Sequence, residues 1–364
     1  MQIKFSPNYL ITPKIANNLI KIGEIKEKIL HLPLTPKLLA SLRETARLFT
    51  THYSTMIEGN RLAPNEVEKV LQHKGHFPGR ERDEKEVKGY YNALSLVEKW
   101  VSKGTKITER MVKELHAHVM SGGKSKVKPT AYRDGQNVIR DALTKQIIYM
   151  PPEAKDVPAL MAGFINWIHQ NPDIPSPIVA AIAHYQFATI HPYYDGNGRC
   201  ARLLTTLILH LGGYDLKGLY SLEEYYARNL GAYYEAISVG PSHNYYLGRA
   251  RAEITKWVEY FIDGLADSFE KTIKRMHEQA REGVSDQSEI LRKLDPKQRK
   301  VLELFNEFET IAANQVAQLF GFKSRYSALL CKNWVELGFL EIADHSNKNR
   351  KYRLSKLYTA VGMK

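Results

Sequence analysis

The sequence predicts a mainly α-helical protein that carries two small β-hairpins. Most of the chain consists of helical segments, such as the amphipathic segment 81–103, ERDEKEVKGYYNALSLVEKWVSK. Prolines separate these segments instead of interrupting them, as Pro33 and Pro64 show. Strand composition is confined to two places, QIIYM at 146–150 and the pair FLEIAD and KYRLS near the C-terminus.

Length and composition indicate a folded protein with anionic partners. A chain of 364 residues predicts two or three folded units. Apolar residues at 43% suffice for a core, and charged residues at 25% are typical of soluble proteins and not of disordered ones. The net charge of +13 favours partners such as nucleotides or nucleic acid, but it does not distinguish them.

Cysteine usage and hydropathy predict a cytoplasmic protein with no membrane partner. Cys200 and Cys331 lie far apart and follow no metal-binding spacing, so we expect free thiols in a reducing compartment. The N-terminal segment lacks the apolar run and the cleavage site of a signal peptide. No stretch approaches the roughly 18 uninterrupted apolar residues of a membrane span.

The first part of the chain, residues 1–104, is predicted to be a helical region. Helical segments over 14–72 are separated by prolines, and the segment 81–103 adds a further helix. The next helix, TERMVKELHAHVM, begins the following region. Thr108 is its predicted cap, because a threonine oxygen can accept from a free N–H of the first turn.

The central region, residues 105–280, is predicted to be a helical domain with one hairpin inside it. In TAYRDGQNVIRDALTKQIIYMPP, the pair Asp134-Gly135 predicts a turn, and two prolines end the strand QIIYM. Further helices are expected at 156–170, 176–190, 198–212, 222–239 and 250–280.

The polar stretch 281–293 is predicted to be a linker to a separate small domain, residues 294–364. PKQRKVLELFNEF, ANQVAQLF and SRYSALLCKNWVEL are predicted helices, and Gly321 and Gly338 end the last two. FLEIAD and KYRLS then form a hairpin. Three helices followed by a two-stranded wing resemble a winged helix-turn-helix.

Residues 191–202, HPYYDGNGRCAR, carry the chemistry. The glycines of the turn allow positive φ and a close approach of the backbone to a ligand, and the helix N-terminus that follows favours an anion. Asp195 can hold Mg²⁺, and Arg199 and Arg202 lie on one helical face and suit polyphosphate oxygens. His191 can take a proton from an incoming hydroxyl. Together these residues predict transfer of a phosphorus-centred group.

This segment closely resembles the signature HPFxDGNGRxxR of the Fic family, and the resemblance covers roughly residues 107–265. Tyr193 departs from the pattern, which has phenylalanine there, so its hydroxyl needs a partner or a route to solvent. The resemblance implies a Fic helical core with a small β-hairpin flap, and it implies the following site roles. His191 is the general base, Asp195 the Mg²⁺ or Mn²⁺ ligand, Gly196, Asn197 and Gly198 the phosphate cradle, and Arg199 and Arg202 the contacts to the outer phosphates.

Two more segments are similar to parts of that family. The hairpin at about 137–150 resembles the Fic flap, which pairs with an extended stretch of the target protein; a purely structural hairpin is the alternative. LGAYYEAISV resembles the adenine-pocket helix, with Tyr233 and Tyr234 as nucleotide contacts. Tyrosines on a helix are also common in cores and on surfaces, so that alternative stays open.

Upstream, Ser54 and Glu58 resemble the family's inhibitory motif, (S/T)xxxE(G/N), in its N-terminal arrangement. They are four residues apart, so they share a helix face, and Gly59 is a natural helix end. In that case Glu58 pairs with Arg202 and places negative charge where the γ-phosphate of ATP belongs. Outside such a family, a serine and a glutamate at this place would mark only a helix end.

The resemblance implies a protein adenylyltransferase that moves AMP from ATP onto a Ser, Thr or Tyr hydroxyl, and the reverse removal of AMP stays open. One alternative is a DNA-binding regulator that acts through 294–364, whose wing carries Lys348, Arg350, Lys351 and Arg353. Another is a Fic core that transfers a different nucleotide or phosphoryl group. A homodimer is also left open.

Overall fold

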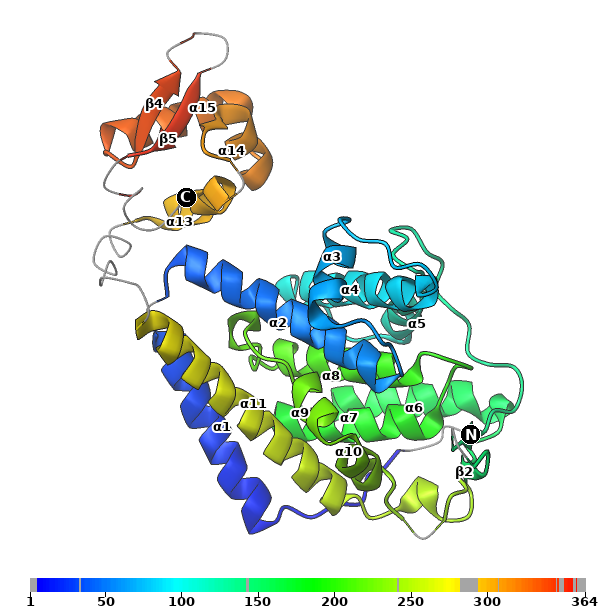
Figure 1. The fold of residues 1–364 in the computed structure, drawn as a ribbon. Helices are drawn as coiled ribbons and strands as arrows, with labels where there is room; N and C mark the ends of the chain where they lie inside the picture. Colours follow the sequence, from blue (N-terminus) through cyan, green and yellow to red (C-terminus); the bar gives the residue numbers. More distant parts are fainter. Residues whose placement is uncertain are drawn as a thin grey trace. The chain divides into compact units, whose positions relative to one another are not determined.

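The computed structural model shows two compact units (Figure 1). One comprises residues 1–30 and 45–274, and the other comprises residues 31–44 and 275–364. The structure describes residues 5–358 apart from 33, 142–143, 241, 282–293, 307, 345, 347–349 and 356–357. The predicted linker 281–293 therefore lies, except for Arg281, outside the described residues.

The predicted mainly α class is confirmed, and most helix bounds agree with the sequence patterns to within a few residues. The helices before the C-terminal part of the chain are α1 (Pro13–His31), α2 (Pro36–Ile57), α3 (Pro64–Leu71), α4 (Glu81–Ser102), α5 (Glu109–Val119), α6 (Val157–Gln170), α7 (Ser176–Ile190), α8 (Asn197–Leu211), α9 (Glu223–Arg228), α10 (Leu230–Ile237) and α11 (Thr255–Arg281).

The prediction of one continuous helix at 222–239 is wrong. The segment 222–239 forms two helices, α9 and α10, with Asn229 between them in a non-helical conformation. The side chain of Asn229 accepts a hydrogen bond from the backbone N–H of Ala232, so this residue caps α10. A short polar side chain that competes for backbone N–H groups favours such a cap over a helix interior.

The antiparallel pair α7 and α8 forms the centre of the first unit. α7 is apolar on nearly every side and almost wholly buried, and most of α8 is buried as well. α4 and α5 pack against α8, and α6 packs against α7. The indole N–H of Trp257 in α11 donates to the carbonyl of Ala181 at 2.7 Å, which closes the remaining side of α7.

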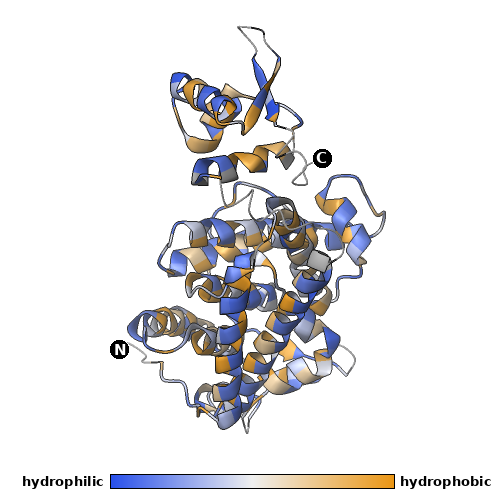
Figure 2. Cartoon of the chain, turned by 90° about the vertical axis from the view of Figure 1, so that its left-hand side faces the viewer, coloured by the Kyte–Doolittle hydropathy of each residue, from blue (hydrophilic) through white to orange (hydrophobic). Residues whose placement is uncertain are grey.

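The helices around this pair have one apolar and one polar face, and blue and orange residues alternate along the same ribbon in Figure 2. Burying the apolar faces against α7 and α8 supplies the main stabilisation of a helical core of this kind. Residues 45–104 share this compact unit with residues 105–274. The helices that the sequence predicts as an N-terminal region therefore pack in the same unit as the predicted core.

The first hairpin pairs β1 (Ile139–Arg140) with β2 (Ile147–Tyr149) in antiparallel fashion. Met150 continues beyond β2 and forms an isolated parallel bridge with Asn244. The hydroxyl of Tyr149 donates to the carbonyl of Thr189 at 2.7 Å, so the base of the hairpin is attached to the end of α7. Ile147 and Ile148, in contrast, are exposed.

The C-terminal part of the second unit has helices followed by a hairpin. Its elements are α13 (Pro296–Val301), a 3₁₀ turn at Leu302–Asn306, β3 (Ile311–Ala312), α14 (Ala313–Phe320), α15 (Ser324–Glu336), β4 (Leu340–Asp344) and β5 (Lys351–Leu354). The strands are antiparallel in the order β3, β5, β4, and a core that includes Cys331, Trp334 and Phe339 lies beneath them. The two-residue strand β3 was not predicted, because it is too short to show an alternating pattern.

The winged helix-turn-helix identity and DNA binding by this unit stay predictions. Of the basic wing residues, Arg350, Lys351 and Arg353 are exposed at the hairpin, and Lys348 lies outside the described residues. Among the residues that the structure describes, no helix is long and apolar enough to cross a membrane.

The predicted cap of α5 provides a test of the helix boundaries. The hydroxyl oxygen of Thr108 accepts from the backbone N–H of Met111 at 3.2 Å. Replacing Thr108 by alanine should lower the free energy of unfolding by about 1 kcal/mol, because one N–H of the first turn loses its acceptor. Thr108→Ser keeps the acceptor and is the matched control. Urea unfolding followed by tryptophan fluorescence measures both, and equal unfolding midpoints for the two variants would contradict the cap.

Candidate active site

The turn between α7 and α8 places the residues of the predicted motif at one end of the central helix pair. α7 ends at His191, which adopts a left-handed conformation with φ of 52°, and Pro192 prevents the helix from continuing. Gly196, with φ of 77°, precedes the first residue of α8. Glycine is required at this position for two reasons. A Cβ there would lie 2.9 Å from the sulfur of Met120, and residues with a side chain rarely adopt this backbone conformation.

Two side chains hold this turn in shape. The side-chain oxygen of Asn197 accepts from the backbone N–H of Tyr193 at 3.0 Å, and its side-chain N–H donates to the carbonyl of Tyr193 at 2.8 Å. His116 in α5 stacks on the ring of Tyr193 with a centroid distance of 3.6 Å. Its Nε2 lies 2.9 Å from the carbonyl oxygen of Asp195, which can only accept, so this nitrogen carries the proton. In the predicted phosphate cradle, the side-chain amide of Asn197 therefore binds the loop itself, and Asn197 can offer a ligand only its backbone N–H.

The hydroxyl of Tyr193 is buried and finds no hydrogen-bond partner among the described residues. The sequence predicted that this extra hydroxyl, relative to phenylalanine, needs a partner or a route to solvent. The structure provides neither. Burial accordingly raises the pKa of Tyr193 far above its usual range, so the phenol stays neutral.

His191 is a neutral base with one nitrogen available. Its Nδ1 lies 3.4 Å from the carbonyl oxygen of Ala188, so Nδ1 holds the proton and Nε2 presents a lone pair. The pKa of His191 is lowered to about 4, mainly by burial and in part by the positive charge of Arg133, while the hydrogen bond to Ala188 and the charges of Glu58 and Asp195 act in the opposite direction. At neutral pH the imidazole is therefore uncharged and ready to accept a proton.

The two arginines of the motif have different partners. Arg199 is buried; its Nη2 lies 3.3 Å from Asp195 and its Nη1 lies 4.0 Å from Glu86. Arg202 is 1% exposed in its side chain and contacts the end of α2. Its Nε donates to the hydroxyl of Ser54 and its Nη2 donates to the carbonyl of Ser54, both at 2.8 Å.

Glu58 lies against both Arg202 and the start of α8. Its Oε1 accepts from Nη2 of Arg202 at 2.8 Å. A Cβ built on Gly198 would lie only 2.2 Å from the same oxygen, so the carboxylate rests on the backbone of the first helical turn. The chain thus puts its own carboxylate at the position where the free N–H groups of a helix N-terminus favour an anion. α2 ends at Ile57, directly before Glu58, and Gly59 then turns left-handed with φ of 93°.

Behind Arg202, a chain of hydrogen bonds leads to a second carboxyl group. Ser54 accepts from Arg202 and hydrogen-bonds in turn to the buried hydroxyl of Tyr90. Tyr90 donates to Oε1 of Glu223 at 3.2 Å, and Ser221 donates to Oε2 at 3.1 Å. Burial raises the pKa of Glu223, whereas the charge of Arg202 lowers it. The guanidinium therefore has Glu58 on its open side and Glu223 on its buried side.

The two predicted pocket tyrosines lie in different environments. Tyr233 is buried, and its hydroxyl lies 2.9 Å from Nε2 of His184. The hydroxyl of Thr205 donates its proton to the carbonyl of Ala201, so it can only accept from Nδ1 of His184. Nε2 of His184 then carries no proton and must accept from the hydroxyl of Tyr233. Tyr234, by contrast, is 47% exposed and donates to the carbonyl of Ile57 at 3.4 Å. Tyr234 is therefore the one of the pair with a surface free for a base.

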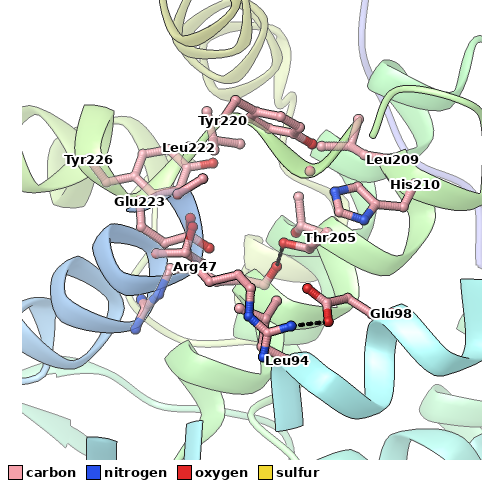
Figure 3. A pocket seen from close by; sticks show the side chains of 15 residues that line it. Arg47, Leu94, Glu98, Thr205, Leu209, His210, Tyr220, Leu222, Glu223 and Tyr226 are labelled. Atoms are coloured by element: carbon pink, nitrogen blue, oxygen red, sulfur yellow. Dashed lines mark hydrogen bonds and ion pairs between the residues drawn. The ribbon is translucent and has the colours of Figure 1, made fainter. Parts of the chain in front are cut away.

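The pocket behind Arg202 holds about 30 Å³ and has both apolar and polar side chains in its lining (Figure 3). Glu223, Tyr226, Tyr220 and His210 surround it in the close-up. The hydroxyls of Tyr220 and Tyr226 have no partner among the described residues. A pocket of this volume has room for a water molecule, which would satisfy these two groups.

Asp195 fits a divalent cation that also binds phosphate. Its side chain is 56% exposed, and it lines a cavity of about 300 Å³ together with Arg199, Glu86, Arg82 and Lys85. Among the described residues, no group of three or more His, Cys, Asp or Glu side chains could hold a metal ion without help. A single carboxylate agrees with Mg²⁺, which usually takes one or two carboxylates and completes its shell with water and substrate phosphates.

Sequence reasoning missed the residues that support this site from other elements. They are Arg133, His116, Tyr90 and Glu223. Local sequence gives no signal for these roles, because the contact that links each residue to the site joins positions more than 50 residues apart along the chain.

Comparison with known proteins gives consistent matches. Residues 106–209 match the model of the Fic/DOC family. A protein adenylyltransferase Fic of Nematostella vectensis is 30% identical over 198 residues, which are 53% of this chain and 44% of that protein. Protein adenylyltransferase fic-1 of Caenorhabditis elegans is 29% identical over 57% of this chain and 40% of that protein. The chain thus spans less than half the length of these two relatives.

A solved structure is similar over nearly the whole chain. The crystal structure of a Fic family protein from Desulfovibrio desulfuricans G20 has a TM-score of 0.62 and 26% sequence identity. The match covers 97% of this chain and 99% of that one. The similarity therefore extends beyond the segment that the family model covers.

A pair of tyrosine variants tests the polar contacts of the site. Tyr193→Phe removes a hydroxyl that has no partner, so the free energy of unfolding should stay the same or rise by about 1 kcal/mol. Tyr233→Phe leaves Nε2 of His184 unsatisfied and should lower the free energy of unfolding by about 1–3 kcal/mol. Urea unfolding of both variants measures the difference. A larger loss in Tyr193→Phe than in Tyr233→Phe would contradict the assigned bonds.

Proposed function

We propose that this chain, whose residues 106–209 match the Fic/DOC family model, transfers AMP from ATP to a hydroxyl side chain of a protein. The observation that carries the proposal is the geometry of residues 191–202. A neutral imidazole with a free Nε2 lies beside a helix N-terminus whose anion position is already filled by a carboxylate. A base next to an anion site is what nucleotidyl transfer to a hydroxyl requires.

The reaction follows from these groups. The triphosphate takes the position at the start of α8, where Gly198 leaves room and Arg202 offers its guanidinium. The hydroxyl oxygen of the target attacks the α-phosphorus of ATP while Nε2 of His191 takes the hydroxyl proton. The bond from the α-phosphorus to the oxygen of the β-phosphate breaks, and pyrophosphate leaves. Mg²⁺ or Mn²⁺, held by Asp195 together with the phosphates, would neutralise part of their charge.

The target protein docks on the hairpin in this proposal. β1 and β2 form a two-stranded sheet at 139–149, with exposed Ile147 and Ile148 and an anchored base. An extended segment can add to such a sheet through main-chain hydrogen bonds, which places a hydroxyl without demanding a particular sequence. Tyr234 is the proposed adenine contact. The names of the two relatives support AMP as the transferred group, and transfer of another nucleotide is the alternative.

Glu58 inhibits the chain in this proposal. A carboxylate on Gly198 and a γ-phosphate on Arg202 compete for the same place, so ATP binds productively only when Glu58 moves away. Glu58 is 28% exposed in its side chain, whereas Arg202 is buried, so the carboxylate is the partner that can be displaced. Removal of AMP by a water molecule that Glu58 activates stays open, as does a homodimer.

Label position tests the reaction itself. With ATP labelled in the α-phosphate, the chain and added protein should become labelled, and γ-labelled ATP should give no protein label, because pyrophosphate leaves. His191→Ala should lower the rate by roughly 100- to 10,000-fold, since it removes the base, while ATP affinity measured by calorimetry stays similar. Label arriving from the γ-phosphate, or full activity of His191→Ala, would contradict AMP transfer. A reaction in EDTA serves as the metal control.

Glu58→Gly tests the inhibition. The variant should label protein roughly ten- to a hundredfold faster than wild type under matched ATP and Mg²⁺, because a charged hydrogen bond no longer competes with the phosphate. Glu58→Gln is the matched control that keeps the size and loses the charge, and it should fall between. The gain should vanish when Arg202→Ala is added, since both changes act through one contact.

Removal of AMP from a pre-labelled protein must be measured in the same series. A faster net labelling that arises only from lost removal would leave the forward rate of Glu58→Gly equal to that of wild type. Equal forward rates in the two proteins would mean that residues 54–60 form only a helix end.

A further inference from the structure

Arg133 lies in the segment of the chain between α5 and β1. Its side chain and its backbone N–H together donate to four carbonyl oxygens. Arg133 is 3% exposed. Its Nε donates to the carbonyl of His191 at 2.9 Å, its Nη1 donates to that of Gly135 at 3.0 Å, and its Nη2 donates to that of Pro152. Its backbone N–H donates to the carbonyl of Pro192 at 2.9 Å.

Arg133 is a charged side chain at a buried position, and its hydrogen-bond partners are neutral carbonyl groups. The geometry of the guanidinium explains why an arginine stands there. Burial lowers the pKa of Arg133, because the charged form loses its water. Burying a charged side chain costs free energy, and an apolar side chain at the same place often stabilises a core equally well. The planar fork of the guanidinium, however, holds several acceptors in one fixed arrangement, which neither lysine nor an apolar side chain can reproduce.

The carbonyls that Arg133 binds belong to three segments of the proposed mechanism. His191 and Pro192 belong to the turn after α7, Gly135 precedes the hairpin, and Pro152 follows it. His191 has the left-handed backbone that non-glycine residues adopt only when their surroundings hold them there. A single side chain therefore connects that backbone to both ends of the hairpin.

We propose that Arg133 is a positioning residue that fixes the imidazole of His191 relative to the hairpin on which the target docks. This inference rests on the proposed function. Among the described residues, no hydrogen bond or ion pair joins Arg133 to the start of α8, to Arg202 or to Glu58. It acts through the His191 carbonyl and the two hairpin ends, so it governs the distance between the base and the bound hydroxyl, and not the binding of ATP. A displacement of about 1 Å at such a place can slow a reaction a hundredfold.

The test uses the full chain with Glu58→Gly as the parent and Arg133→Lys and Arg133→Gln as variants. Arg249→Lys is the matched control, because Arg249 is also buried and donates to two carbonyls, those of Ile237 and Val239. Three quantities are measured below the lowest unfolding temperature of the set. They are the labelling rate from α-labelled ATP, the dissociation constant of ATP, and the side-chain ¹³C and ¹⁵N signals of His191, identified by their loss in His191→Ala.

We expect both Arg133 variants to label roughly ten- to a hundredfold more slowly than the parent, with ATP affinity changed less than twofold. The ¹⁵N signals of His191 should show a single Nδ1–H tautomer in the parent and in Arg249→Lys, and a mixture or broadened signals in both Arg133 variants. Arg133→Lys keeps the charge, so a loss in that variant belongs to the geometry of the fork.

Unchanged His191 signals in the Arg133 variants, or an equal loss of rate in Arg249→Lys, would overturn the inference, because a general effect of losing a buried arginine would then suffice. A loss of ATP affinity that accounts for the whole rate change would also overturn it. Because the spectra do not require activity, an inactive parent would count against the proposed function and would leave the tautomer of His191 as the independent measure of the role of Arg133.

Discussion

The buried guanidinium of Arg202 is the constraint on which the site depends. A charge that is almost wholly removed from water must have partners of opposite charge or strong acceptors. In this structure Ser54, in α2, and Glu58, directly after it, provide them, although both lie 144 or more residues away along the chain. The need to satisfy one arginine therefore attaches the end of α2 to the start of α8. In the proposed function, ATP can replace the carboxylate only because its phosphate meets the same need.

The partners of Arg202 differ in how easily they can be exchanged. On the buried side, Ser54, Tyr90 and Glu223 form a hydrogen-bonded chain without access to solvent. Burying such groups without partners would be costly, so this side is held in place. On the open side, Glu58 keeps partial exposure and can regain water when it leaves. In the proposed function, this difference makes Glu58 the displaceable contact and leaves Arg202 in position to receive a phosphate.

The turn before α8 is held by a second, separate set of contacts. Asn197 closes the loop on itself, His116 holds Asp195 from α5, and Arg133 holds His191 from the hairpin side. These contacts involve backbone atoms, so they determine where the loop lies without using the side chain of His191 or Arg202. In the proposed function, positioning of the base and binding of the phosphates therefore depend on different residues and can be separated experimentally.

The sequence by itself determined the fold class, most helix bounds and the composition of the loop, since each depends on residues close together in the chain. His191, Asp195 and the two arginines have fixed helical or turn spacing, and Ser54 and Glu58 share a face for the same reason. Only the tertiary structure decided that Tyr233 faces the core while Tyr234 faces out, that Tyr193 has no partner, and that Arg133, Tyr90 and Glu223 support the site. Such contacts join segments far apart in the chain, and packing chooses them, so no local pattern records them.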